Sequence, residues 1–203
     1  VKIMLKNKKI NWIIKVHPAN KVKDSRDNKS NFSEYNAIMK LVKKLPENIK
    51  FINSDHKIST LSYFNNIDYC LTVRGTVGIE AACYGVAVIT AGSGRYDGLG
   101  FTKDHKTRHE YLETIKNLHN LKIDIKKIKR LAIKFAYNLY VSRTFPTDNI
   151  KFYFKKNSNN TMTHDLVDDG SNEIFDKSNI KKLKRWFLSN EEDYLESKRY
   201  DYD

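Results

Sequence analysis

The sequence contains little cysteine, little proline and no long apolar run. Its two cysteines, Cys70 and Cys83, are too few for a disulfide framework or a zinc site, and both lie in or beside expected core elements. No apolar stretch is long enough to cross a bilayer, and no signal peptide is visible at Val1. We therefore expect a protein of the reducing cytoplasm. Because strand-like residues begin almost at once, we also expect this chain to be the rear part of a longer protein.

Acidic residues are scarce relative to basic ones. The chain carries 37 Lys and Arg against 24 Asp and Glu, a formal charge of +13. The excess is +8 over residues 1–101 and +5 over residues 102–203, so it is spread along the chain. No recognised nucleic-acid motif accompanies it, so nucleic acid is not the favoured partner. An acidic nucleotide, an acidic glycan or anionic lipid head groups fit a diffuse positive surface equally well, and a merely solvated lysine-rich surface is an equal alternative.

Buried runs alternate with amphipathic segments over the first two-thirds of the chain. This alternation is typical of βαβ units and predicts an α/β fold, a Rossmann-like parallel sheet with helices on both faces. Pro46 would close an early helix, and Gly85 is a natural residue to end the central one. The expected strands cover residues 12–16, 50–53, 69–73 and 86–90, and the expected helices cover residues 32–45, 58–65, 77–84, 108–118 and 125–141.

The character of the sequence changes near residue 145. We expect a Rossmann-like domain over residues 1–145 and an extension over residues 146–203 that packs on it. The polar, asparagine-rich stretch 153–163 shows no clear period and predicts a loop, as does the polar stretch 19–31. Residues 179–188 have helical character, so the extension is expected to be helical.

The segment over residues 71–92 is the most informative part of the chain. It reads as a buried strand, a glycine turn at Gly75, a short helix from Val77 and a second buried strand. Such a turn leaves the first N–H groups of the helix without partners, and these form an anion site. Thr76 is expected to cap the helix with its hydroxyl, and Gly78 leaves room for an approaching phosphate.

Two charged side chains accompany this turn. Arg74 directly precedes Gly75 and would either reach a phosphate or form a salt bridge. Glu80 lies four residues after Thr76, so both project from one face of the helix, where the carboxylate would accept hydrogen bonds from ribose hydroxyls. Phosphate at the start of the helix and ribose one turn along describe a nucleotide site. The alternative is that Thr76 only caps the helix, Gly78 only allows close packing and Glu80 is only a surface charge.

A histidine and a glycine-rich loop are expected at the same edge of the sheet as the turn. His17 ends the first strand, and its imidazole would donate a hydrogen bond to a phosphate oxygen or stand on the surface. The loop over residues 91–102 carries four glycines and leaves the carboxyl end of a central strand, where open α/β sheets bind ligands. The residues expected to line a base or sugar pocket are Pro18, Gly92, Tyr96 and Phe101.

A metal site is not expected. The spacing of His105 and His109 would place both on one helical face, with Glu110 beside them, as zinc sites require. No third ligand is evident, and Lys103 and Lys106 add positive charge nearby. We therefore expect a solvated helix start there, and neither a metal nor a resident cofactor.

Six short motifs follow one another in a fixed order along residues 10–118. They are His17-Pro18, Leu45-Pro-Glu-Asn48, Asp68-Tyr-Cys-Leu71, Gly75-Thr-Val-Gly-Ile-Glu-Ala81, Gly85-Val-Ala-Val-Ile89 and the loop from Gly94 to Thr102. Their order resembles the nucleotide-binding half of the capsule polysaccharide biosynthesis proteins, which are similar to the Kdo transferases of capsule assembly. The sequence departs from that pattern in two ways: Val86-Ala87 stands where a small residue and proline are usual, and Arg74 stands where a small or polar residue is usual.

The resemblance implies the C-terminal half of a two-domain GT-B glycosyltransferase, the half that holds the nucleotide-sugar donor. That donor is a CMP-sugar in the Kdo enzymes. By the same resemblance, His17, Gly75 and Thr76 contact the donor phosphate and Glu80 holds the ribose. The general base would belong to an N-terminal half, so the catalytic residues stay unknown. The implied partners are a glycan or glycolipid acceptor and, by peripheral contact, the anionic inner face of the cell membrane.

Two other functions stay open on the sequence. A UDP-sugar transferase or a 2-epimerase of similar build would use the same turn for a different nucleotide. A binding module for nucleic acid or another polyanion would use the α/β domain as a scaffold and the basic surface as its site.

Overall fold

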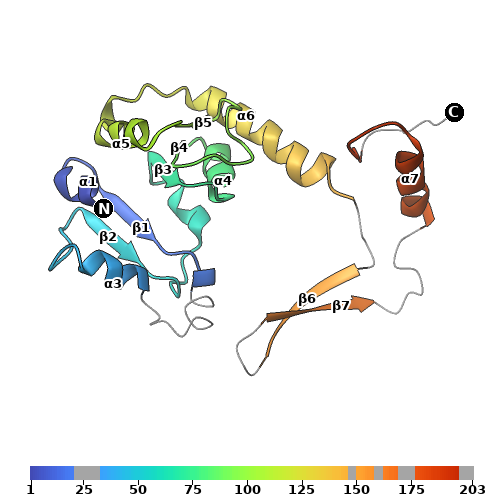
Figure 1. The fold of residues 1–203 in the computed structure, drawn as a ribbon, viewed down its shortest axis with the longest axis horizontal. Helices are drawn as coiled ribbons and strands as arrows, with labels where there is room; N and C mark the ends of the chain where they lie inside the picture. Colours follow the sequence, from blue (N-terminus) through green and yellow to red (C-terminus); the bar gives the residue numbers. More distant parts are fainter. Residues whose placement is uncertain (21–32, 146–149, 158–161, 169–176, 197–203) are drawn as a thin grey trace. The chain divides into compact units, whose positions relative to one another are not determined.

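The computed structural model describes residues 1–20, 33–145, 150–157, 162–168 and 177–196. The chain forms two compact units, Val1–Leu131 and Ala132–Asp203, which are coloured from blue to yellow-green and from yellow to red in Figure 1. The division falls within a helix, earlier in the chain than the predicted boundary at residue 145. That residues 146–203 pack on the first domain stays a prediction.

The first unit is built on parallel strands. Strand β1 (Trp12–Lys15) pairs with β2 (Ile49–Ile52), and β4 (Ala87–Thr90) lies between β3 (Tyr69–Thr72) and β5 (Thr102–Lys103). The flanking helical elements are α1 (Lys2–Lys6), α3 (Ser33–Met39), the 3-10 turns Thr60–Tyr63 and Leu118–Asn120, α4 (Val77–Cys83), α5 (Arg108–Lys116) and α6 (Ile125–Tyr137), which runs on into a π-helical turn, Asn138–Ser142. The structure thus confirms the predicted α/β, Rossmann-like fold.

Burial explains the central strands. All four residues of β4 are buried, as expected of a strand with neighbours on both edges and helices over its faces. Helix α4 ends before Gly85, whose φ of +87° is the left-handed conformation that glycine adopts without a steric penalty. The turn at Gly85 therefore brings the chain from the end of α4 directly into β4.

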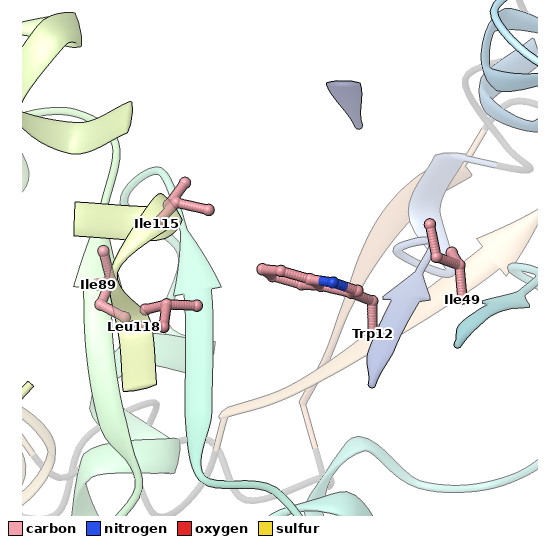
Figure 2. Close-up of a cluster of buried hydrophobic side chains, with 5 residues drawn as sticks. All are labelled: Trp12, Ile49, Ile89, Ile115 and Leu118. Atoms are coloured by element: carbon pink, nitrogen blue, oxygen red, sulfur yellow. The ribbon is translucent and has the colours of Figure 1, made fainter. Parts of the chain in front are cut away.

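One hydrophobic cluster joins the two sheets. It contains Trp12 and Ile49 from the β1–β2 sheet, Ile89 from β4, and Ile115 and Leu118 from α5 and the turn after it. In Figure 2 the Trp12 ring lies between Ile49 and the other three side chains. Trp12 is only 5% exposed. The two sheets therefore share one core although no strand ladder between them is recorded in the described residues.

Three expectations for the first unit differ from the structure. The chain starts with the short helix α1, not with strand material, and Ile3, Met4 and Leu5 pack from it against the core cluster. Helix α3 ends at Met39, well before Pro46. Of the predicted loop 19–31, only Ala19 and Asn20 belong to the described part of the chain, and both are helical. The other strands and helices predicted for this unit are confirmed, residues 58–65 as a 3-10 turn capped by Ser59.

The second unit contains a hairpin and a helix. Strands β6 (Ile150–Lys156) and β7 (Met162–Asp168) are antiparallel, with Ile150 opposite Asp168. The prediction of a loop over residues 153–163 is therefore wrong at residues 153–156 and 162–163, and residues 158–161 lie outside the described residues. The alternation in Ile150-Lys-Phe-Tyr-Phe-Lys has the period of a strand, but the prediction gave more weight to the asparagine content. Helix α7 (Lys177–Leu188) confirms the predicted helix.

The net charge differs completely between the two units. Residues 1–131 carry 25 basic and 12 acidic side chains, whereas residues 132–203 carry 12 of each. The formal excess of +13 therefore belongs to the first unit. No helix in the described residues is long and apolar enough to span a membrane.

Candidate functional site

The loops that follow β3 and β4 pack against each other. Tyr96 in the second loop donates a hydrogen bond from its hydroxyl to the Gly75 carbonyl in the first, at 2.9 Å. A Cβ added at Gly94 would lie 3.0 Å from the Arg74 Cβ, so glycine allows the close approach. The Gly94 N–H donates to Asp97 Oδ2 at 2.7 Å, which closes the second loop on itself. The carboxyl ends of the two strands thus form one connected structure.

The turn at Thr76 differs from the predicted cap. Thr76 has helical backbone angles, and its hydroxyl makes no capping hydrogen bond. The Gly78 N–H donates to the Gly75 carbonyl, and the Ile79 N–H donates to the Thr76 carbonyl. Within the described residues, the N–H groups of Thr76 and Val77 have no recorded acceptor. The donors available to an anion are therefore these two, together with the Thr76 hydroxyl.

Gly78 is a packing residue. It is buried, and a Cβ there would lie 2.6 Å from the Tyr96 hydroxyl oxygen and 3.3 Å from Thr72 Cγ2. The expectation that Gly78 leaves room for a phosphate is therefore wrong, because Tyr96 occupies that space. Tyr96 and Phe101 are each 1% exposed, with ring centroids 5.8 Å apart, so they are core residues beneath the turn. Their side chains do not form the exposed lining of a pocket at this turn.

We expect Gly78→Ala to lower the free energy of unfolding by about 2 kcal/mol, the scale of an overpacked core, although alanine favours a helix over glycine by about 1 kcal/mol. In a Tyr96→Phe background the same substitution should cost clearly less, because the oxygen that clashes is gone. Urea denaturation followed by circular dichroism measures both. Gly92→Ala is the matched control, since its Cβ would meet only the movable Val73 side chain at 3.2 Å. Equal costs in the two backgrounds would contradict the packing role.

Arg74 and Thr76 are exposed on the surface of this turn. Arg74 forms no ion pair with any residue that the structure describes, so the salt-bridge alternative for it is not seen there. Gly92 is half-buried against Val73. As far as the described residues go, a guanidinium without an ion pair therefore lies next in sequence to two N–H groups without an acceptor, those of Thr76 and Val77, and this gives the turn a positive surface.

Glu80 lies farther inside the fold than a surface charge would. Its side chain is half-buried. Burial raises the pKa of the Cys70 thiol to about 11 and also raises the pKa of the Cys83 thiol, and the negative charge of Glu80 raises both further. Both cysteines are free, and Cys70 is a neutral thiol at physiological pH. The hydrogen bonds from ribose to Glu80 stay a prediction.

His17 directly follows the β1 ladder and is exposed, as is Pro18. Its Nδ1 accepts a hydrogen bond from the Ala19 N–H at 3.1 Å. In the neutral imidazole this places the proton on Nε2, which is then free to donate to a ligand. No recorded contact joins His17 to the turn at Thr76 among the described residues, so their convergence on one pocket stays a prediction.

A polar network at the β4–β5 edge was missed from the sequence. Asp104 Oδ1 accepts from the hydroxyls of Thr90 at 3.0 Å and Thr102 at 2.6 Å, and Oδ2 accepts from the Gly98 N–H at 2.9 Å. Because Thr90 is fully buried, this carboxylate satisfies a hydroxyl that water does not reach. The network fixes the far end of the glycine-rich loop.

His105 belongs to the same edge, and the expectation that it is part of a solvated helix start is wrong. It is half-buried, with Nδ1 3.0 Å from the Thr90 carbonyl and Nε2 2.8 Å from Thr114 Oγ1. Since a carbonyl only accepts, Nδ1 carries the proton. Both ring nitrogens are therefore engaged, and His109 is exposed. Over the described ranges, no group of three or more His, Cys, Asp and Glu side chains could hold a metal ion.

A separate hollow of about 230 Å³ lies along β5. Phe101 borders it together with Lys103, Lys122 and Lys127, at the start of α6. It is lined by the β4–β5 strands and not by the turn at Thr76, so it is distinct from the site built on that turn.

A model of a protein family matches residues 4–140, which is most of the chain. Its description is capsule polysaccharide biosynthesis protein. The chain belongs to this family. No curated protein and no solved structure matches it. The capsule polysaccharide biosynthesis match includes His17, the turn at Thr76 and Asp104, whereas α7 lies beyond its end. The membership supports a role in capsule synthesis.

Proposed function

We propose that this chain binds the nucleotide-sugar donor of a glycosyltransferase in capsule polysaccharide synthesis. The observation that carries the proposal is the turn after β3, where Arg74 adjoins two N–H groups and the Thr76 hydroxyl, none of which has a recorded partner among the described residues. The loop after β4 holds this turn through Tyr96. Nucleotide sites of open α/β sheets lie at the same place, beyond the carboxyl ends of the strands.

The chemistry that this arrangement supports is transfer with departure of a nucleotide phosphate. Positioned donors at a developing negative charge stabilise the transition state, and Arg74 with the Thr76 and Val77 N–H groups would act in this way. His17 would add a further donor through Nε2. Glu80 would select the ribose. A CMP-linked donor, such as CMP-Kdo, is the version that the family resemblance favours, with a glycan or glycolipid as acceptor.

Titration calorimetry with CMP, UDP and GDP tests the proposal directly. We expect saturable binding of one nucleotide, with CMP preferred. Preference for UDP would move the assignment to a UDP-sugar transferase or a 2-epimerase-like enzyme. Absence of binding by all three, in a sample shown to be folded by circular dichroism, would remove the proposal.

His17→Ala should weaken nucleotide binding by about 1–3 kcal/mol, the usual contribution of a hydrogen bond to a charged group. His56→Ala is a closely matched control, because His56 is also exposed and its Nδ1 also accepts from the N–H two residues on, at 3.2 Å. The control should bind as the unmodified chain does. Equal losses in the two variants would show that His17 does not reach the nucleotide.

The charge distribution favours one alternative of a different class. Since the whole excess of +13 lies in residues 1–131, this unit would also suit a module that binds nucleic acid or an acidic polymer. Such a module would bind DNA with a steep dependence on salt and would show no affinity for mononucleotides. The calorimetric series, repeated with an oligonucleotide at two salt concentrations, separates the two functions.

A further inference from the structure

Helix α7, the dark red helix in Figure 1, has one face that its own unit already covers. Asn179 is buried, and Trp186 packs edge-on against Tyr194 with ring centroids 5.8 Å apart. Lys182 forms an ion pair with Glu196 at 2.5 Å. These contacts tie the inner face of the helix to the segment that follows it.

The outer face of α7 is apolar and open. Ile180 and Phe187 are seven residues apart, so they project from the same side of the helix, and they are 50% and 71% exposed. Half-buried Leu183 lies between them on that side, and Leu188 is 53% exposed at the end. Exposed apolar side chains gathered in this way mark an interaction surface for a protein or a membrane.

Cations lie beside this apolar stripe and within it, since Lys184 is four residues after Ile180 and four residues before Leu188. Lys181, Lys184 and Arg185 are exposed, and none of them forms an ion pair with a residue in the described ranges. A helix with an apolar face, flanking Lys and Arg, and modest overall hydropathy is the kind that lies in the interface of a membrane.

We propose that the outer face of α7, defined by Ile180, Leu183, Phe187 and Leu188, docks on an anionic lipid surface. Phe187 and Ile180 enter the boundary between head groups and acyl chains, and the three cations meet the anionic head groups. The inference goes beyond the proposed nucleotide site and does not rest on it, since α7 lies outside the family match. It would attach the chain to a membrane surface without a spanning segment.

Sedimentation of the full chain with vesicles tests this docking. We expect binding to vesicles of phosphatidylcholine mixed with phosphatidylglycerol, and much weaker binding to pure phosphatidylcholine. Phe187→Ser should lower the partition coefficient about tenfold, because it removes most of one buried aromatic side chain. Leu61→Ser is the matched control, since Leu61 is 43% exposed in the first unit, and it should leave vesicle binding unchanged.

A charge variant tests the second half of the proposal. Lys184→Glu combined with Arg185→Glu should abolish the preference for phosphatidylglycerol, and added salt should weaken binding of the unmodified chain. Both positions are exposed, as is Phe187, so these variants are expected to fold. Equal binding to both vesicle types, equal loss in Phe187→Ser and Leu61→Ser, or no vesicle binding at all would overturn the proposal. The last outcome would point to a protein or a second copy on this face, and nucleotide binding would be unaffected by it.

Discussion

Trp12→Ala should lower the free energy of unfolding of the first unit by about 4 kcal/mol, the range found for large aromatic residues removed from a core. Trp12 is 5% exposed and lies between the two sheets in the core cluster (Figure 2), so no single neighbour can move in to fill the cavity. Urea denaturation monitored by circular dichroism gives the value. It is the largest stability effect that we expect from one substitution in this chain.

The same substitution should also weaken nucleotide binding, although Trp12 belongs to no proposed contact. His17 follows β1 and Thr76 follows β3, so the position of one relative to the other depends on the core that joins their sheets. Ile13→Ala is the matched control, because Ile13 is the next residue of β1 and is 44% exposed. It should change stability by less than about 0.5 kcal/mol. If both variants cost the same, the two sheets do not share a core.

Asp104→Ala should lower the free energy of unfolding by about 3 kcal/mol. Its carboxylate accepts three hydrogen bonds, and its loss leaves the fully buried Thr90 hydroxyl without that acceptor. Asp104→Asn should lower the free energy of unfolding by less than Asp104→Ala does, because one side-chain oxygen still accepts hydrogen bonds. It should still lower it, because the amide nitrogen cannot accept from the Gly98 N–H.

Denaturation of these two variants, with Asp55→Ala as the control, measures the effect. Asp55 is exposed and has no recorded partner in the described part of the chain, so its removal should be close to neutral. Because Asp104 anchors the end of the loop after β4, its alanine variant should also loosen that loop. Faster proteolysis between Gly92 and Phe101 would report this. A neutral Asp104→Ala would mean that the Lys103 carbonyl, 3.4 Å from the Thr90 hydroxyl oxygen, is a sufficient acceptor for it.

Local patterns predicted most elements of the first unit because those elements repeat at a fixed period. The continuous apolar runs of β3 and β4, and the glycine that ends α4, were visible in the sequence and are confirmed. The hairpin over residues 150–168 was missed because its charged and asparagine-rich residues hid a period of two. The short helix α1 was not predicted, because five residues are too few to show a helical period.

The candidate site was predicted as a set of residues but not as an arrangement. The turn motif located Arg74, Thr76 and Val77, which are exposed or half-buried at the carboxyl end of β3. The same motif suggested an open Gly78, and the glycine-rich loop suggested that Tyr96 lines a pocket. In the structure each fills the space beside the other, because the loop after β4 folds over the turn.

The sequence by itself determined the α/β class, the positions of β1 to β4 along the chain and the family, because these depend on local periodicity and on short motifs in a fixed order. Only the tertiary structure decided the partner of each polar or small residue. The contacts of Gly78 with Tyr96, of His105 with Thr90 and Thr114, and of Trp12 with both sheets join residues that are far apart in the chain. Such contacts depend on which faces pack together, which no local repeat encodes.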